Sequence, residues 1–144
     1  MGCIHFFRKC ALAAALLLPA VCGATAATAA TAAMHCWVTY AGHTQRIPIP
    51  ITDSPYTVEA VEIGERFRFK ALHVKGPDRV ERIDIYVYRL DESNAVLIQH
   101  AQRTPPWPVA ANGRRVDLVG EQHLYSGPLE RELSYQCGRG VSQP

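Results

Sequence analysis

Hydrophobic and polar residues alternate with a period of two along much of the chain after residue 34, which is typical of β-strands with one buried face. Pro and Gly interrupt this alternation repeatedly, and helical periodicity is weak throughout. The number and spacing of the strands favour an all-β fold, a single antiparallel β-sandwich of immunoglobulin-like type. A small barrel is the alternative. The pattern predicts eight strands, at about residues 35–41, 44–49, 56–61, 64–74, 80–90, 95–103, 115–125 and 129–137.

The clearest local pattern is a hairpin over residues 64–90. Each of its two strands alternates apolar residues with basic, polar or Tyr residues, so each presents one apolar face. A three-residue turn at 76–78 points both apolar faces inward and places Phe69 opposite Ile85. The outer face then carries a mixed set of basic and aromatic side chains: Arg66, Arg68, Lys70, Tyr86 and Tyr88.

The strand predicted at 95–103 follows this hairpin through a four-residue turn at 91–94. A turn of that length places Val96 opposite Arg89. The same register places His100 at the core or its rim, because its partner on the preceding strand belongs to the apolar face.

The first 33 residues predict an export signal rather than part of the fold. Arg8 and Lys9 form a short basic segment, residues 11–21 form an apolar run, and small residues follow. The apolar run is about half of the roughly 20 residues that span a bilayer, so no stable membrane insertion is expected once the signal is removed. The chain is expected to divide into a signal peptide, a flexible Ala/Thr-rich segment, a β-sandwich domain and a flexible tail, at 1–26, 27–33, 34–138 and 139–144.

Removal of the signal changes the charge of the chain. The full sequence has 15 Lys and Arg against 13 Asp and Glu, and the loss of Arg8 and Lys9 makes the two numbers equal. A domain without net charge has no long-range attraction for nucleic acid or anionic lipid. We therefore expect a monomeric periplasmic or secreted protein that does not bind nucleic acid. A lipid anchor on Cys22 is not favoured, because Val21 precedes it where a small residue is needed.

The cysteines predict one disulfide. Three of the five lie in the signal region, which leaves Cys36 near the start and Cys137 near the end of the domain. Two cysteines in an oxidising compartment are expected to pair, and this pair would bring the first and last strands together. No further cysteine motif accompanies them, so they do not form a zinc site by themselves.

No motif in the sequence carries a recognised catalytic chemistry. The chain has no GxSxG, no Walker-type loop, no HExxH and no GxGxxG. We therefore expect a protein that is not an enzyme and holds no cofactor. The alternative is an enzyme with a site of carboxylates or His residues that no short motif marks.

Two surfaces are candidates for binding a partner. Basic and aromatic side chains on the outer face of the predicted hairpin are suited to an acidic or sugar-like ligand, through cation–π and stacking contacts. Their structural alternative is a solvent-exposed sheet face. Trp107 lies in a Pro-rich loop at 104–113, and an aromatic residue on a stiff loop is a good anchor for a partner. Its structural alternative is a ring folded back over the end of the core.

A metal site is the remaining possibility. His73, His100 and His123 could meet across strands, although their spacing predicts no ligand pair within one strand. The favoured interpretation is an exported, non-enzymatic binding or accessory domain for a partner protein or small ligand, and the alternative is a periplasmic copper or other metal-binding carrier or sensor.

Overall fold

The computed structural model describes residues 34–92, 94–108, 115–127 and 131–140, and these residues form strands and no helices. The predicted signal peptide and Ala/Thr-rich segment lie outside the described residues, as do the last four residues of the predicted tail. No helix in the described part of the chain is of a kind that could span a membrane. The strands are β1 (Met34–Tyr40), β2 (His43–Pro48), β3 (Ile51–Thr52), β4 (Val61–Ile63), β5 (Phe67–Gly76), β6 (Arg79–Asp91), β7 (Asn94–Arg103), β8 (Val116–Ser126) and β9 (Arg131–Arg139).

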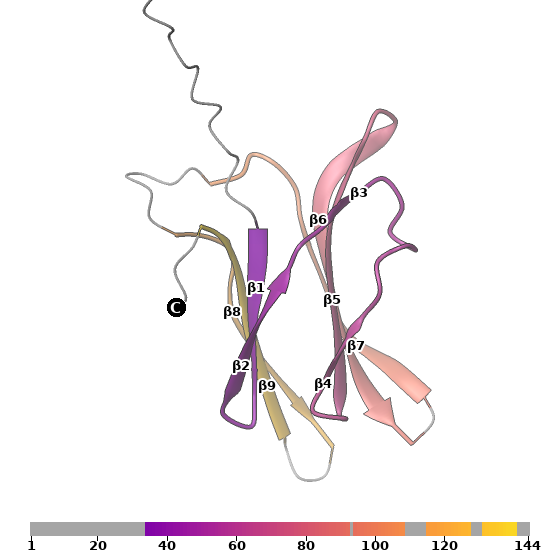
Figure 1. The fold of residues 1–144 in the computed structure, drawn as a ribbon, viewed down its shortest axis with the longest axis vertical. Helices are drawn as coiled ribbons and strands as arrows, with labels where there is room; N and C mark the ends of the chain where they lie inside the picture. The colour runs from indigo at the N-terminus through magenta and orange to yellow at the C-terminus, as the bar shows by residue number, and fades with distance from the viewer. Residues whose placement is uncertain (1–33, 93, 109–114, 128–130, 141–144) are drawn as a thin grey trace, which may run out of the picture. The chain divides into compact units, whose positions relative to one another are not determined.

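The strands form two sheets that face each other across one core (Figure 1). The first sheet has the order β2-β1-β9-β8, and the second has the order β3-β5-β6-β7 with β4 also paired to β5. The alternating apolar residues of the central strands fill the space between the sheets, as the period of two predicts. Phe69 of the second sheet packs edge-on against Tyr135 of the first, with 5.2 Å between the ring centroids.

A disulfide joins Cys36 on β1 to Cys137 on β9. The two residues are direct cross-strand partners in the first sheet, and both are fully buried. The prediction that the first and last strands lie side by side and are joined by this bond is confirmed.

The strand order differs from that of an immunoglobulin domain. Apart from the β1–β9 pair, strands that pair in the described residues are neighbours or near neighbours along the chain, and the chain passes to the second sheet after β2 and returns to the first before β8. All pairs are antiparallel except β3 with β5, which run parallel. The structure therefore supports two sheets of largely antiparallel strands, and the immunoglobulin-like part of the prediction is not confirmed.

The hairpin of β5 and β6 has the predicted faces but a different register. Phe69 lies opposite Val87, whereas the sequence pattern placed it opposite Ile85. The difference has two causes. Gly76 pairs with Arg79, so the turn has two residues and not three. A bulge follows, in which two residues of β6 lie opposite one residue of β5. Turn and bulge together move the pairing by two residues, which exchanges partners but leaves each side chain on its predicted face.

A second bulge changes the position of His100. Val96 lies opposite Arg89 as predicted, but Ile98 is an extra residue on β7, and beyond it His100 lies opposite Tyr86. Because a shift of one residue turns side chains to the other face of a sheet, the prediction that His100 lies at the core or its rim is wrong. His100 is exposed on the outer face of the second sheet.

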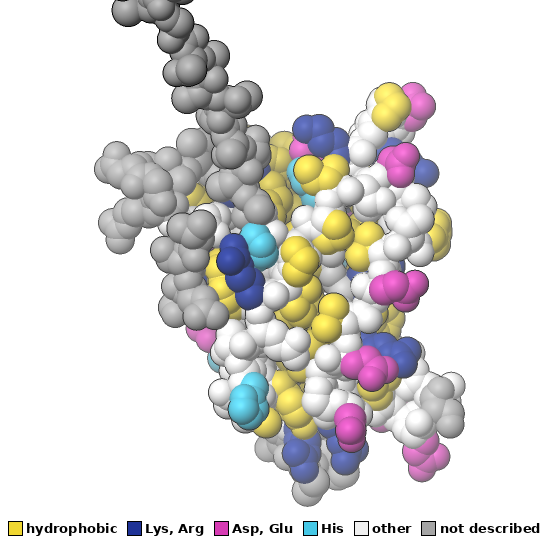
Figure 2. Space-filling model, viewed as in Figure 1, with side chains coloured by type: hydrophobic (Ala, Val, Ile, Leu, Met, Phe, Trp, Pro, Cys, Tyr) yellow, Lys and Arg dark blue, Asp and Glu magenta, His cyan; other side chains and the backbone are white. Residues whose placement is uncertain are grey.

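The segment between β2 and β5 departs most from the predicted strands. The strand predicted at 56–61 is wrong for most of its length, because residues 53–60 form turns and bends. The chain pairs with the edge of β5 only through β3 and β4, on either side of this loop. Figure 2 shows hydrophobic side chains along the middle of the viewed face, between the two sheets of Figure 1.

Candidate functional site

The outer face of the second sheet is partly covered by the loop at 53–60. Leu72 and Val74 point to this face, away from the core cluster, yet both are fully buried. Lys70 ties the loop to the sheet, since its Nζ donates a hydrogen bond of 2.7 Å to the carbonyl of Pro55. The loop therefore creates a site on a face that the sequence pattern described as an open sheet.

A hollow of about 300 Å³ lies between this loop and the sheet. Arg68 and Lys70 of β5 and Tyr88 of β6 form its sheet side. Tyr56 forms part of its loop side and is 91% exposed. The structure thus brings together three of the predicted binding residues, and it adds Tyr56, which the sequence placed in a strand. We call these four residues the tyrosine–arginine hollow.

The two cations of this hollow already have partners. Arg68 Nη2 lies 2.8 Å from Glu62 Oε1 on β4, in an ion pair whose two side chains are about half exposed. Such exposed pairs contribute about 0–1 kcal/mol, so an anionic group of a ligand can compete for Arg68 at small cost. The partner of Lys70 is a neutral carbonyl, so this contact places no opposite charge beside its ammonium group.

Aromatic rings continue the hollow along the sheet. The ring of Tyr86 stacks on His100 with 4.4 Å between centroids, and on Tyr88 with 6.4 Å. Burial, together with the charge of Asp84, raises the pKa of Tyr86, so its phenol is a neutral hydrogen-bonding group. The three residues form a row of near-parallel rings beside the two cations.

Asp84 anchors one end of this row and is only 1% exposed. Its carboxylate accepts hydrogen bonds from Arg82 Nε at 2.8 Å and from Gln102 Nε2 at 2.9 Å, and His100 Nε2 lies 3.4 Å away. The observed register places Asp84 opposite Leu72 on β5. A buried carboxylate with three partners holds His100 in position for its stacking contact.

Trp107 does not join this surface. Its ring packs against the core cluster and meets His73 edge-on at 5.6 Å between centroids, and its Nε1 lies 3.5 Å from Glu81 Oε1. Burial alone would raise the pKa of Glu81, but hydrogen bonds from His73 and Trp107 and the charge of Lys75 lower it below its usual value. Of the two arrangements considered for Trp107, the structure shows the ring folded back against the core. Its role as an anchor for a partner stays a prediction.

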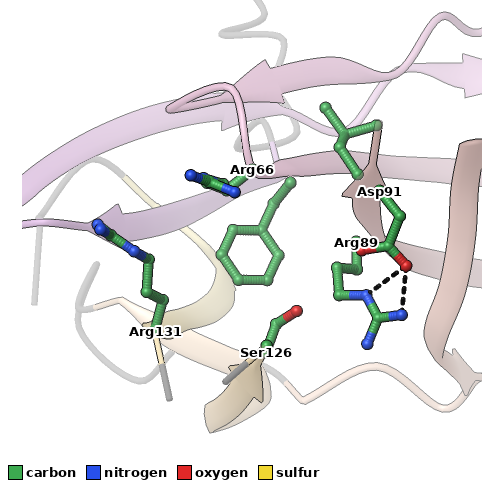
Figure 3. Close-up of a pocket in the computed structure, with 8 residues that line it drawn as sticks. Arg66, Arg89, Asp91, Ser126 and Arg131 are labelled. Atoms are coloured by element: carbon green, nitrogen blue, oxygen red, sulfur yellow. Dashed lines mark hydrogen bonds and ion pairs between the residues drawn. The ribbon is translucent and has the colours of Figure 1, made fainter. Parts of the chain in front are cut away.

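Arg66 does not line the tyrosine–arginine hollow, but with Arg68, Glu62, Glu65 and Glu92 it lines a hollow next to it. It sits in the turn before β5 and lines a separate hollow of about 130 Å³ at one end of the domain, between the two sheets (Figure 3). Arg66 thus lines both the hollow that it shares with Arg68 and the hollow at the end of the domain.

The histidines considered for a metal site lie on different surfaces. His73 faces inward from β5 beside Glu81, and His100 lies on the outer face of the same sheet. His123 lies on the first sheet, where its Nδ1 contacts Glu132 and its Nε2 lies 3.6 Å from Glu121. Within the described ranges, no group of three or more His, Cys, Asp or Glu side chains is arranged to hold a metal ion.

The tyrosine–arginine hollow and the row of rings beside it form a surface on which a ligand can bind. Among the described residues that form this surface, no nucleophilic side chain lies next to a base. Such a surface offers two cations, hydrogen-bonding phenols and flat apolar rings to one ligand. Comparison of the chain with protein-family models, with curated proteins and with solved structures finds no match, so the function rests on this geometry.

Proposed function

We propose that this protein is an exported, non-enzymatic binding domain, and that the tyrosine–arginine hollow holds its ligand. The ligand is a small molecule, or an exposed part of a partner protein, that carries an anionic group next to a flat or apolar one. The observation that carries the proposal is the meeting of Arg68, Lys70 and Tyr88 with the exposed ring of Tyr56 in one hollow.

The chemistry of the hollow supports this type of ligand. Arg68 can leave its exposed partner Glu62 for a ligand carboxylate or phosphate, and its planar guanidinium can bind both oxygens. Tyr56 and Tyr88 provide ring faces at little loss of conformational freedom. A hollow lined in this way binds by charge and stacking together, and neither contact alone would be selective.

The proposed location is supported by the disulfide. A bond between Cys36 and Cys137 persists in oxidising compartments and is rare in the reducing cytosol. The alternative of a metal carrier is not favoured by any observation in the described part of the chain.

The proposal can be tested with a panel of small saccharides and peptides that carry a carboxylate, a phosphate, a sulfate or no charge. We expect the oxidised protein to retain charged members with ring or apolar groups. In the variant Tyr56→Ala/Arg68→Gln, the affinity for these ligands falls by about tenfold or more, because both stacking and a charged hydrogen bond are lost.

The matched control removes one exposed tyrosine and one arginine from the first sheet, in the variant Tyr125→Ala/Arg46→Gln. Its affinities are expected to match those of the unaltered protein. Equal losses in both variants, or retention of uncharged members only, would disprove the tyrosine–arginine hollow as the binding site.

A further inference from the structure

The hollow at the end of the domain has a composition that the tyrosine–arginine hollow lacks. It lies between the two sheets, beside the turn after β4 and the end of β8 (Figure 3). Arginines from both sheets surround it, and its floor includes the fully buried ring of Phe67. The lining residues are Arg66, Phe67, Arg89, Leu90, Asp91, Ser126, Gly127 and Arg131.

The charges around this end hollow do not balance. Among the described residues, three guanidinium groups and one carboxylate, that of Asp91, line it. Arg89 engages that carboxylate through Nε at 3.0 Å and through Nη2, as the dashed lines in Figure 3 show. Arg66 has no side-chain partner among the described residues, and Arg131 has only the phenol of Tyr40, 3.5 Å from its Nη1. Within the described part of the chain these two arginines therefore have no ion-pair partner, although Glu62, Glu65 and Glu92 line a neighbouring hollow with Arg66.

The positions of the two unpaired arginines are fixed by the fold. Gly64 and Glu65 have φ values of 55° and 58°, and the N–H of Arg66 donates to the carbonyl of Ile63 at 3.2 Å. This is a tight turn of type I′, and the carbonyl of Arg66 is held in addition by the N–H of Leu90 at 2.8 Å.

Tyr40 connects this turn to the other sheet. A Cβ on Gly64 would overlap the ring of Tyr40, so ring and turn are in direct contact. The same ring packs edge-on against Phe67 at 5.5 Å between centroids, and its hydroxyl accepts the hydrogen bond from Arg131. The frame that carries Arg66 and Arg131 is thus assembled before any ligand binds, which lowers the entropy cost of binding.

We propose that the end hollow binds a single oxyanion group, a phosphate, sulfate or carboxylate, either free or at the end of a small ligand. Arg66 and Arg131 supply forked N–H donors, and the hydroxyl of Ser126 supplies a further donor between the sheets. A hollow of about 130 Å³ is large enough for one such group. This inference does not depend on the proposed function, because none of its residues lines the tyrosine–arginine hollow.

The test uses inorganic phosphate, sulfate and acetate as probes, each exchanged for chloride at constant ionic strength. Amide and arginine Nε signals are followed by NMR in the oxidised protein. We expect saturable shifts at Arg66, Ser126, Gly127 and Arg131. Methyl phosphate distinguishes the two sources of the group: equal affinity to phosphate indicates a site that accepts a terminal group, and loss of binding indicates a site for the free ion.

Two variants identify the residues. Arg66→Gln/Arg131→Gln is expected to weaken binding by about tenfold or more, because hydrogen bonds to a charged group are lost. Arg79→Gln/Arg103→Gln removes the same charge from exposed positions outside the end hollow and should leave the affinity within about twofold.

A variant that binds the anion more tightly distinguishes the proposal from a loss of binding that is caused by misfolding. Asp91→Asn removes the carboxylate that occupies Arg89 and repels an anion, so it should tighten binding several-fold. A linear response to every probe, an equal loss in both double variants, or weaker binding in Asp91→Asn would each overturn the proposal.

Discussion

At the scale of single residues, several polar side chains are held by partners from another strand. The hydroxyl of Tyr135 donates to Gln99 Oε1 at 2.7 Å and so connects β9 of the first sheet to β7 of the second. Burial raises the pKa of Tyr135 to about 12, so its phenol stays protonated and keeps this bond at physiological pH. Buried polar groups that are satisfied in this way favour one packing of the two sheets over others.

His123 predicts a pH dependence. The hydrogen bond to Glu132 raises the pKa of His123 above its usual value of 6.5, and the charge of Glu121 adds to the effect. A histidine whose pKa is higher in the folded state stabilises the fold below pH 6.5, and this contribution is lost as the pH rises through the folded-state pKa. We expect an NMR titration to show a pKa above 6.5.

The control for this prediction is His123→Gln. The free energy of unfolding should differ between the unaltered protein and the variant most at about pH 6, and the difference should shrink towards pH 8 to 9. A pKa of His123 at or below 6.5, or a difference that does not change with pH, would contradict the contact with Glu132.

At the scale of elements, the sequence predicted which side of a strand faces the core better than it predicted which residues pair across strands. Alternation in β5 and β6 depends on a period of two, and it gave the correct inward side for Phe67, Phe69 and Ile85. Partners depend on turns and bulges, which add single residues and leave little signal in one sequence. The bulge at Ile98 therefore went unpredicted, and with it the outward position of His100 beside Asp84.

The candidate site was only partly predictable for the same reason. Arg68, Lys70 and Tyr88 were recovered because they alternate with core residues. Tyr56 was missed, because a loop that folds back over a sheet has no periodic pattern. Arg66 was assigned to the sheet face, yet the turn at Gly64 and Glu65 places it at the end hollow.

The turns at Gly42 and Gly64 allow a matched prediction about the turn that carries Arg66. Gly42 and Gly64 both have positive φ, 78° and 55°, but a Cβ at Gly42 meets nothing within 4 Å whereas one at Gly64 overlaps Tyr40. Gly42→Ala should cost about 1–2 kcal/mol of stability, for the backbone conformation alone. Gly64→Ala should cost roughly 1–3 kcal/mol more, for the overlap.

Urea unfolding of both variants measures the difference between them. Equal losses would show that the ring of Tyr40 moves away freely. In that case the turn would not hold Arg66 in place, and the frame of the end hollow would be weaker than its contacts indicate.

At the scale of the whole molecule, a net charge of zero does not describe how the charged residues are distributed over the surface. The 13 acidic and 13 basic residues that follow the predicted signal cancel, which argues against attraction to polyanions at long range. At one end of the domain, Arg66 and Arg131 have no ion-pair partner among the residues that the structure describes. Recognition of a small anion is therefore a short-range property that composition cannot reveal.

The disulfide has its effect at this largest scale, because Cys36 and Cys137 are separated by 101 residues and enclose nearly the whole domain. In the chain-entropy model a closed loop of this length stabilises the fold by about 4.7 kcal/mol. We expect Cys36→Ala/Cys137→Ala to lose about 3–5 kcal/mol and to show a larger urea m-value, because its unfolded chain is more expanded. Reductant should destabilise the unaltered protein and leave this variant unchanged. A loss below about 1 kcal/mol would mean that pairing of β1 with β9 constrains the ends without the bond, and that oxidation is not required for folding.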